Sequence, residues 1–350
     1  MYTPVLKNRT VEMSVLSQFA KTGVFDDQRI LPLVELIQEK TRTNSKSTVI
    51  EEISDLLTAS PKMTIMVDLP KSTKLSNTTD AVRNYVTLST RQPDFCINEL
   101  QKLATHANNI IPVVSYLKDN VSLERISYEA SEYRNIFPRL AFRVLTQDFE
   151  RIFSRVEELV AENDIVILDI ETASHSSPVF KKIYKRISDS KKQLQFISII
   201  INSNRPETLT NKGMANGEPI AEIDNSLKES YNLNMMNRFD GFGDYACIVA
   251  SLPSTGGTIS PAGIYYSNEN NFFVAYTGRK PNLSEFPEFI APSIVQSEYW
   301  AEYGNTHHKN CPGCLEIDAI VQQKKSGKNQ AQWKMITMLH YIYTMFETNA

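Results

Sequence analysis

Short apolar runs alternate with amphipathic segments along most of this 350-residue chain. The runs are rich in Val, Ile, Leu and Phe and are nearly unbroken, which is typical of strands buried on both faces in a parallel sheet. Between them, apolar residues recur at helical spacing, as in Val49–Leu57, where Thr48 and Glu51 form a capping box. We expect eight strands, at Tyr2–Leu6, Ile30–Ile37, Met63–Asp68, Ile110–Tyr116, Arg139–Leu145, Ile165–Ile170, Leu194–Ile201 and Tyr245–Ser251.

Eight strand–helix units that close on themselves form a (β/α)8 barrel. We expect seven helices between the strands, the seventh at Ile220–Tyr231, and an eighth at Trp333–Phe346 that closes the ring. An open doubly wound sheet is the alternative, because periodicity alone cannot show closure. Eight units without a long break favour the α/β class and a TIM-like barrel.

The eighth unit is much longer than the others. Two β-like runs, Gly263–Ser267 and Asn271–Thr277, and a loop-like stretch separate its strand from its helix. We therefore predict a barrel over residues 1–251, a long insertion between strand 8 and helix 8 over 252–332, and a closing helix over 333–350. Loops that follow barrel strands lie on the face where active sites form, so the insertion is expected to cap that C-terminal face. A small separate C-terminal domain is the alternative.

The composition is that of an ordinary globular protein. Lys and Arg number 37 and Asp and Glu 40, for a net charge of −3, and 41% of residues are hydrophobic. These values exclude disordered, collagen-like and coiled-coil chains, and they argue against bulk nucleic-acid binding. Four cysteines are too few for a disulfide scaffold. With no signal-peptide pattern and no apolar run that could span a bilayer, we expect a soluble, cytoplasmic protein without a membrane partner.

Charged residues at the ends of barrel strands are the first candidates for chemistry. A charge within an apolar strand must be paired, bound to a metal or turned toward a wet cavity. We predict a barrel mouth where carboxylates face basic groups, suited to hold a divalent cation or to perform acid–base chemistry on a phosphate or sugar. Internal salt bridges are the alternative. The candidate catalytic residues are Lys7, Glu35, Asp68, Arg143, Asp169 and Asp244, and Lys7 and Glu35 are expected to touch.

A second candidate site lies in the predicted insertion. Two thiolates in a Cys-x-x-Cys motif can bind one tetrahedral ion, and a histidine three or four residues upstream can supply a third ligand. The predicted ligands of a structural zinc ion are His307, His308, Cys311 and Cys314. One of these two histidines would be the third ligand beside the cysteines, and the fourth is open between the other histidine, Cys247, His340 and water. A redox cysteine pair and an inert turn at Pro312-Gly313 are the alternatives.

Several common catalytic motifs are absent from the sequence. It contains no Walker loop, no GxGxxG after the first strand, no GxSxG and no HExxH. P-loop nucleotide hydrolysis, Rossmann redox chemistry and zincin-type proteolysis are therefore disfavoured.

Short motifs at both ends of the chain resemble the phage beta-protein family, which occurs in T-even phages and in bacteria. At the N-terminus they are Tyr2-x-Pro4-x-Leu6-Lys7-x-Arg9-x-x-Glu12 and Ile30-Leu-Pro32-Leu-Val-Glu35. Toward the C-terminus they are Gly241-Phe-Gly-Asp244-Tyr, Cys311-x-Gly313-Cys314 and Gly327-x-Asn329, with Trp333 and His340. The resemblance implies an α/β-barrel-like accessory protein with a role in phage–host conflict. It implies no particular reaction.

Two function hypotheses follow. The first is an enzyme-like barrel whose mouth acts on a phosphorylated small molecule, a nucleotide or a nucleic-acid end. The second is a non-catalytic scaffold that binds a phage or host protein through its insertion. A site requires the carboxylates and Lys7 to converge on one open cavity, whereas a scaffold leaves them as mutually paired salt bridges.

Overall fold

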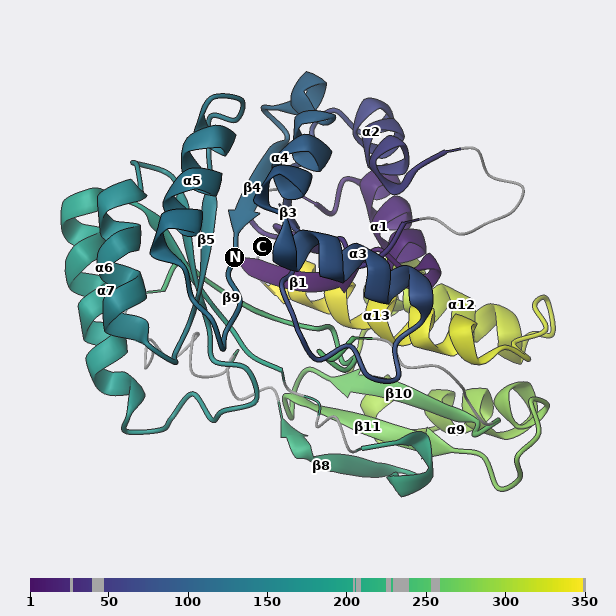
Figure 1. Ribbon diagram of the computed structural model, residues 1–350. Helices are drawn as coiled ribbons and strands as arrows, with labels where there is room; N and C mark the ends of the chain where they lie inside the picture. Colours follow the sequence, from purple (N-terminus) through teal and green to yellow (C-terminus); the bar gives the residue numbers. More distant parts are fainter. Residues whose placement is uncertain are drawn as a thin grey trace.

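The structure is a computed structural model that describes residues 1–25, 28–39, 47–203, 205, 209–224, 228, 239–252 and 259–348. Eight parallel strands close into a barrel in the order β1-β2-β3-β4-β5-β6-β7-β9 (Figure 1). Because Tyr2 of β1 pairs with Phe242 of β9, the ring is closed and the open doubly wound sheet is excluded. The predicted TIM-like barrel is confirmed. Its strands are β1 (Tyr2–Lys7), β2 (Leu33–Glu35), β3 (Ile65–Asp68), β4 (Ile110–Val114), β5 (Ala141–Leu145), β6 (Ile165–Asp169), β7 (Ile197–Ile201) and β9 (Gly241–Asp244).

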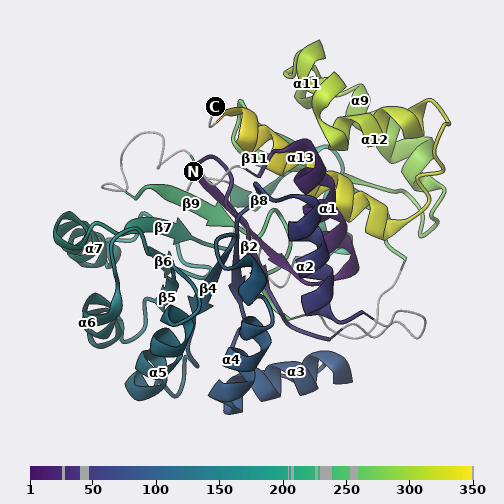
Figure 2. The ribbon, with the colours of Figure 1, turned by 90° about the horizontal axis from the view of Figure 1, so that it is seen from above.

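Helices surround the barrel, as Figure 2 shows from above. The barrel helices are α1 (Thr10–Thr22), α2 (Val49–Ala59), α3 (Asp80–Arg91), α4 (Pro93–Gln101), α5 (Leu123–Arg134), α6 (Phe149–Leu159) and α7 (Phe180–Leu194). The predicted capping box begins α2, since the Thr48 hydroxyl accepts from the Glu51 amide and the Glu51 carboxylate accepts from the Thr48 amide. No helix within the described residues combines the length and the apolar character that crossing a membrane requires.

The main core lies between the barrel strands and these helices. Every residue of β2, β3, β4 and β6 is buried, which explains the nearly unbroken apolar runs of the sequence at these strands. On the outside, α6 presents Ile152, Phe153 and Val156 to the sheet, and each of these side chains is almost fully buried. Burial of each large apolar side chain contributes roughly 1.5–3 kcal/mol of favourable free energy, so these layers supply most of the free energy that favours folding.

The last barrel strand was expected at Tyr245–Ser251, and this prediction is wrong. The strand is Gly241–Asp244, and the chain turns immediately after it because Ala246 and Cys247 adopt left-handed φ values of 47° and 65°. Gly243 pairs with Thr3, and a Cβ at Gly243 would lie 2.3 Å from the Thr3 carbonyl oxygen. Close approach of β9 to β1 therefore requires glycine, and a Gly-Phe-Gly strand lacks the apolar run by which the others were recognised.

A second, three-stranded sheet lies beside the barrel in the order β10-β11-β8. Strands β10 (Ala262–Ser267) and β11 (Phe272–Thr277) match the β-like runs of the sequence. Strand β8 (Glu218–Asp224) occupies part of the stretch expected as a helix at Ile220–Tyr231, so that prediction is wrong for residues 220–224. Of its remaining residues, only Lys228 lies within the described part of the chain.

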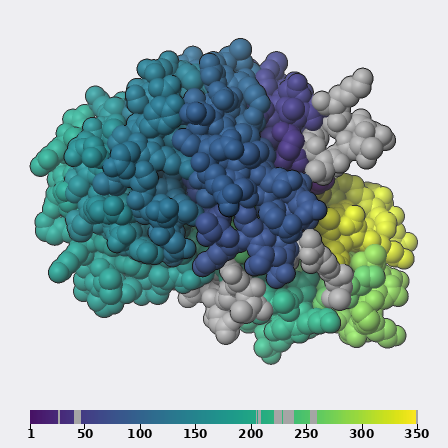
Figure 3. Space-filling view, viewed as in Figure 1, coloured from purple at the N-terminus to yellow at the C-terminus, as the bar shows by residue number. Residues whose placement is uncertain are grey.

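The C-terminal helix α13 (Gln330–Thr348) lies between the barrel and the second sheet (Figures 1 and 2). It packs against α1 and β1 on one side and against β10 and α12 (Pro312–Val321) on the other. The remaining short elements of this region are η3 (Phe286–Ile290), α9 (Ala291–Val295), α10 (Glu298–Ala301) and α11 (Asn305–Asn310). In the space-filling view these green and yellow segments occupy one corner of the molecule, beside the blue and teal barrel helices (Figure 3).

Candidate functional site

A cavity of about 1010 Å³ opens where the barrel strands end. Its walls come from the ends of β2, β3, β5 and β6 and from the loops that follow β3, β4, β6 and β9. Among the described residues its lining ends at Leu252, and no residue of 259–329 contributes. The predicted capping role of the insertion therefore stays a prediction. The division of the chain into residues 1–251, 252–332 and 333–350 also stays a prediction.

Arg143 of β5 occupies the centre of the cavity floor. Its Nη1 donates to Glu35 Oε1 at 2.7 Å and to Asp68 Oδ2 at 3.1 Å. Its Nε and Nη2 donate to Asp169 Oδ2 at 2.9 and 2.7 Å. Nη2 also donates to the Tyr245 hydroxyl at 2.7 Å. One guanidinium thus joins three carboxylates from three different strands.

This arrangement uses the whole hydrogen-bonding capacity of Arg143. A guanidinium has five N–H donors, and the five contacts above account for all of them. An anionic ligand therefore finds no free donor on Arg143. The side chain instead fixes the positions of the carboxylates and offsets part of their mutual repulsion.

Lys7 of β1 contacts one of the three carboxylates, Glu35 of the adjacent strand β2. Its Nζ lies 3.7 Å from Glu35 Oε2, so the two residues predicted to touch are in contact. Lys7 also donates to the Val249 carbonyl at 3.2 Å and lies over the Tyr245 ring, 4.6 Å from its centroid. The contact follows from register, because Lys7 pairs with Glu35 across β1 and β2. Lys7 is not among the residues that line the cavity.

The environments of the carboxylates differ. Burial raises the pKa of Asp68 despite the nearby Arg143. Burial also opposes ionisation of Glu35, but Lys7 and Arg143 outweigh it and hold the pKa of Glu35 below its usual value. The side chains of Glu35 and Asp169 are 6% exposed and that of Asp68 is 0% exposed. Glu35 and Asp169 can therefore touch a ligand, whereas the Asp68 carboxylate is occupied by Ser115, from which it accepts at 2.6 Å, and by Arg143.

Lysines line the wall above this acidic floor. Lys71 Nζ lies 2.9 Å from Glu129 Oε2 and 3.4 Å from the Ser115 hydroxyl, and its side chain is buried. Lys74 is exposed, and Lys118 pairs with Glu171 at 2.5 Å with 38% of its side chain exposed. The cavity thus combines an acidic floor with a wall, called the basic wall below, on which the three lysines lie beside Asp119 and Glu171.

Asp244 does not join the other predicted mouth residues. It ends β9 but lies outside the cavity lining, and its carboxylate accepts from the Tyr2 hydroxyl at 2.8 Å and the Tyr341 hydroxyl at 2.6 Å. The Ala246 amide also donates to it, at 2.7 Å. Asp244 therefore fastens α13 to the barrel through Tyr341, which is a structural role that the sequence did not indicate.

Sequence reasoning missed three residues that shape the cavity: Tyr245, Lys71 and Lys118. Tyr245 was assigned to a strand, although it follows β9 and contacts Arg143. Lys71 follows Asp68 by three residues, and Lys118 follows the end of β4 by four. Loop position directly after a barrel strand was the signal that could have identified both lysines.

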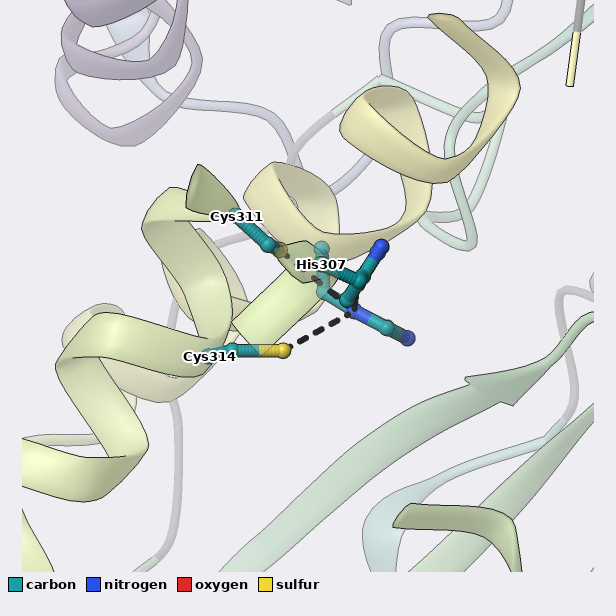
Figure 4. A group of neighbouring side chains, drawn as sticks. His307, Cys311 and Cys314 are labelled. Atoms are coloured by element: carbon teal, nitrogen blue, oxygen red, sulfur yellow. Dashed lines mark hydrogen bonds between the residues drawn. The ribbon is translucent and has the colours of Figure 1, made fainter. Parts of the chain in front are cut away.

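The second candidate site assembles around the terminal helix. His307, Cys311 and Cys314 point toward one another, as Figure 4 shows. Together with His340 of α13 they form a buried group whose possible ligand atoms all lie within 4.8 Å of one another, so the group could hold a metal ion. His308, which the sequence also offered as a ligand, is not part of this group and stacks on Trp300, with 4.2 Å between ring centroids. His340 was one of the open choices for the fourth ligand.

Comparisons with known proteins bear on the family and the fold. No curated protein matches the sequence of this chain. Among solved structures, the catalytic domain of a Bacillus sp. JAMB-750 GH26 endo-β-1,4-mannanase is similar with a TM-score of 0.40 and 11% identity, over 70% of this chain and 73% of that one. A family 18 chitinase from Crocus vernus is similar with a TM-score of 0.38 and 10% identity, over 69% of this chain and 91% of that one. The family model described as "Beta protein" matches residues 2–347, and the chain therefore belongs to the Beta protein family.

Proposed function

We propose that the barrel mouth binds a small hydroxylated molecule that carries a phosphate group, such as a nucleotide, a sugar phosphate or a nucleic-acid end, and performs acid–base chemistry on it. The observation that supports this most is the joint convergence of Glu35, Asp68 and Asp169 on Arg143 at the floor of one open cavity. Of these carboxylates, Glu35 and Asp169 reach the cavity, and their remaining lone pairs can accept hydrogen bonds from hydroxyl groups.

The lysines of the basic wall would bind the phosphate group. Lys118 is partly exposed, and its ion pair with Glu171 lies at the surface, where exchanging one anionic partner for another costs little. Lys74 is exposed and adds a second positive charge. Lysine binds phosphate as a point charge, so a ligand can place its phosphate on this wall while its hydroxyl groups reach the floor.

The acid–base step would fall to the carboxylates that reach the cavity. Lys7 and Arg143 hold Glu35 ionised. Both Glu35 and Asp169 would accept a proton from a ligand hydroxyl. Arg143 would position both carboxylates. A divalent cation at the mouth is a weaker proposal, because the guanidinium already occupies the space among the carboxylates that a cation would take.

A non-catalytic scaffold that binds a phage or host protein through its insertion is the second candidate. It is favoured by the same saturation of Arg143, since a network with all donors satisfied internally is also what a purely structural cluster would have. Within the Beta protein family, either function is compatible with a role in phage–host conflict, and we propose that role for the chain as a whole.

Ligand-induced stabilisation separates the two candidates. A ligand at about 100 times its dissociation constant stabilises a protein by about 2.7 kcal/mol. We expect ribose 5-phosphate or a nucleoside monophosphate to raise the melting temperature, while ribose and the unphosphorylated nucleoside raise it much less. If no phosphorylated compound raises the melting temperature at millimolar concentration, the scaffold is the better account.

A further inference from the structure

The insertion and the terminal helix meet at a group of four buried side chains. The insertion contributes three of them. His307 lies on α11, Cys311 lies between α11 and α12, and Cys314 lies in the first turn of α12. The fourth is His340, in the middle of α13. Three of these residues are fully buried, and His307 is 6% exposed.

Gly313 of α12 allows this helix to lie directly against α13. A Cβ at this position would lie 2.6 Å from the His340 amide nitrogen and 2.8 Å from the Ile336 carbonyl oxygen. Real side chains do not tolerate such distances, so the glycine of the Cys-Pro-Gly-Cys motif is required for α12 to contact α13. The motif is therefore built for an approach between helices, beyond what an ordinary turn needs.

Three of the six distances within the group match edges of a zinc tetrahedron, and the other three are at most 4.8 Å. Zinc binds thiolate sulfur at about 2.3 Å and histidine nitrogen at about 2.0–2.1 Å, so the edges of its tetrahedron are roughly 3.4 Å between two nitrogens and 3.6 Å between sulfur and nitrogen. His340 Nδ1 lies 3.4 Å from His307 Nε2 and 3.6 Å from each of the sulfurs of Cys311 and Cys314.

The outer hydrogen bonds direct the correct nitrogen of each histidine inward. His340 Nε2 lies 3.0 Å from the Tyr266 carbonyl oxygen, which can only accept, so Nε2 carries the proton and Nδ1 presents its lone pair to the group. His307 Nδ1 lies 2.5 Å from Glu347 Oε2, which leaves its Nε2 facing the group. Metal-binding histidines typically have such an acceptor on their second nitrogen.

We infer that His307, Cys311, Cys314 and His340 form a closed structural zinc site that fastens the insertion to the terminal helix. Four protein ligands leave no open position for water or substrate, which is the arrangement of a structural and not a catalytic zinc. Through Tyr341, the neighbour of His340, the same helix is bonded to Asp244 at the end of β9. The zinc would therefore hold the insertion on the barrel.

Metal content and ligand identity can be tested on the full chain. Protein purified without chelator should contain about one equivalent of zinc, and Co²⁺ in its place should give the intense visible absorption of a tetrahedral thiolate site. Cys311→Ser and His340→Gln should each lose most of the metal. His308→Gln is the matched control, because His308 is adjacent in sequence but outside the group, and it should retain the full equivalent.

Two outcomes would overturn the inference. One is wild-type protein that contains no metal and whose melting temperature changes with neither added zinc nor a chelator. The other is a loss of zinc in His308→Gln together with its retention in His340→Gln, which would refute the ligand set. If a ligand variant does not fold, the zinc content and the cobalt spectrum of the wild-type protein still decide the question. A Cys311–Cys314 disulfide in metal-free protein would identify a redox pair instead.

Discussion

Replacing Arg143 with methionine tests whether this side chain organises the barrel mouth. The change keeps most of the apolar volume but removes the partner of three carboxylates that are at most 6% exposed. Among the described residues, only Lys7, 3.7 Å from Glu35, would remain as a cation in direct contact with any of them. Removing one partner of a buried ion pair costs about 3–5 kcal/mol, and we expect at least the middle of that range here.

The loss should depend on pH in a defined direction. Without Arg143, burial and mutual repulsion raise the pKa values of Glu35 and Asp68 above those of the unfolded chain. Their ionisation then destabilises the folded state at neutral pH, and protonation relieves this as the pH falls through the raised pKa values. The difference in unfolding free energy between the wild type and Arg143→Met should therefore be larger at pH 8 than at pH 5.

Equilibrium urea unfolding, followed by circular dichroism at both pH values, measures this difference. Arg151→Met on α6 is the matched control, because Arg151 is 52% exposed and pairs with Asp148 at 3.6 Å, a kind of surface pair that contributes about 0–1 kcal/mol. If Arg143→Met is as stable as Arg151→Met at pH 8, or if its loss does not vary with pH, the carboxylates do not depend on Arg143 and our reading of the floor is wrong.

Two further substitutions test the fold. Val156→Asp places a charge between α6 and the sheet, at a side chain that is 2% exposed, and should cost several kcal/mol and abolish soluble expression; soluble protein with unchanged melting would refute this packing. Gly243→Ala should prevent β9 from closing on β1, because its Cβ would lie 2.3 Å from a backbone oxygen, whereas Gly304→Ala, with open space around it, should melt close to the wild type. Equal melting temperatures for the two alanine variants would contradict the close approach.

The sequence predicted the barrel because its signal is local. Most buried strands can be recognised from an apolar run such as Ile165–Ile170, and most helices from apolar residues at helical spacing. The exceptions have physical reasons. β9 is short and contains two glycines, one of which, Gly243, close packing requires, and β8 pairs with β11, a strand that lies far along the chain.

The candidate sites were only partly predictable. Strand ends identified Glu35, Asp68 and Asp169, since barrel geometry brings them together, but the central place of Arg143 depends on the path of a long side chain. Asp244 was placed at the mouth because it stands just before the expected eighth strand, yet it ends β9 and its carboxylate lies against Tyr2 and Tyr341. Choosing between neighbouring histidines required the packing of α11 against α13, which no local pattern records.

The central claim is that one ligand contacts both the acidic floor and the basic wall of the mouth. Titration calorimetry with a nucleoside monophosphate on Lys118→Gln tests it most directly, because Lys118 is partly exposed and its loss should leave the fold intact. Lys185→Gln is the control, since Lys185 is exposed on α7, pairs with Asp189 and lies outside the cavity lining. We predict an affinity about tenfold weaker in Lys118→Gln, the effect of one charge-assisted contact, and unchanged in Lys185→Gln. Equal affinity in both variants, or no binding by the wild type, would contradict the claim.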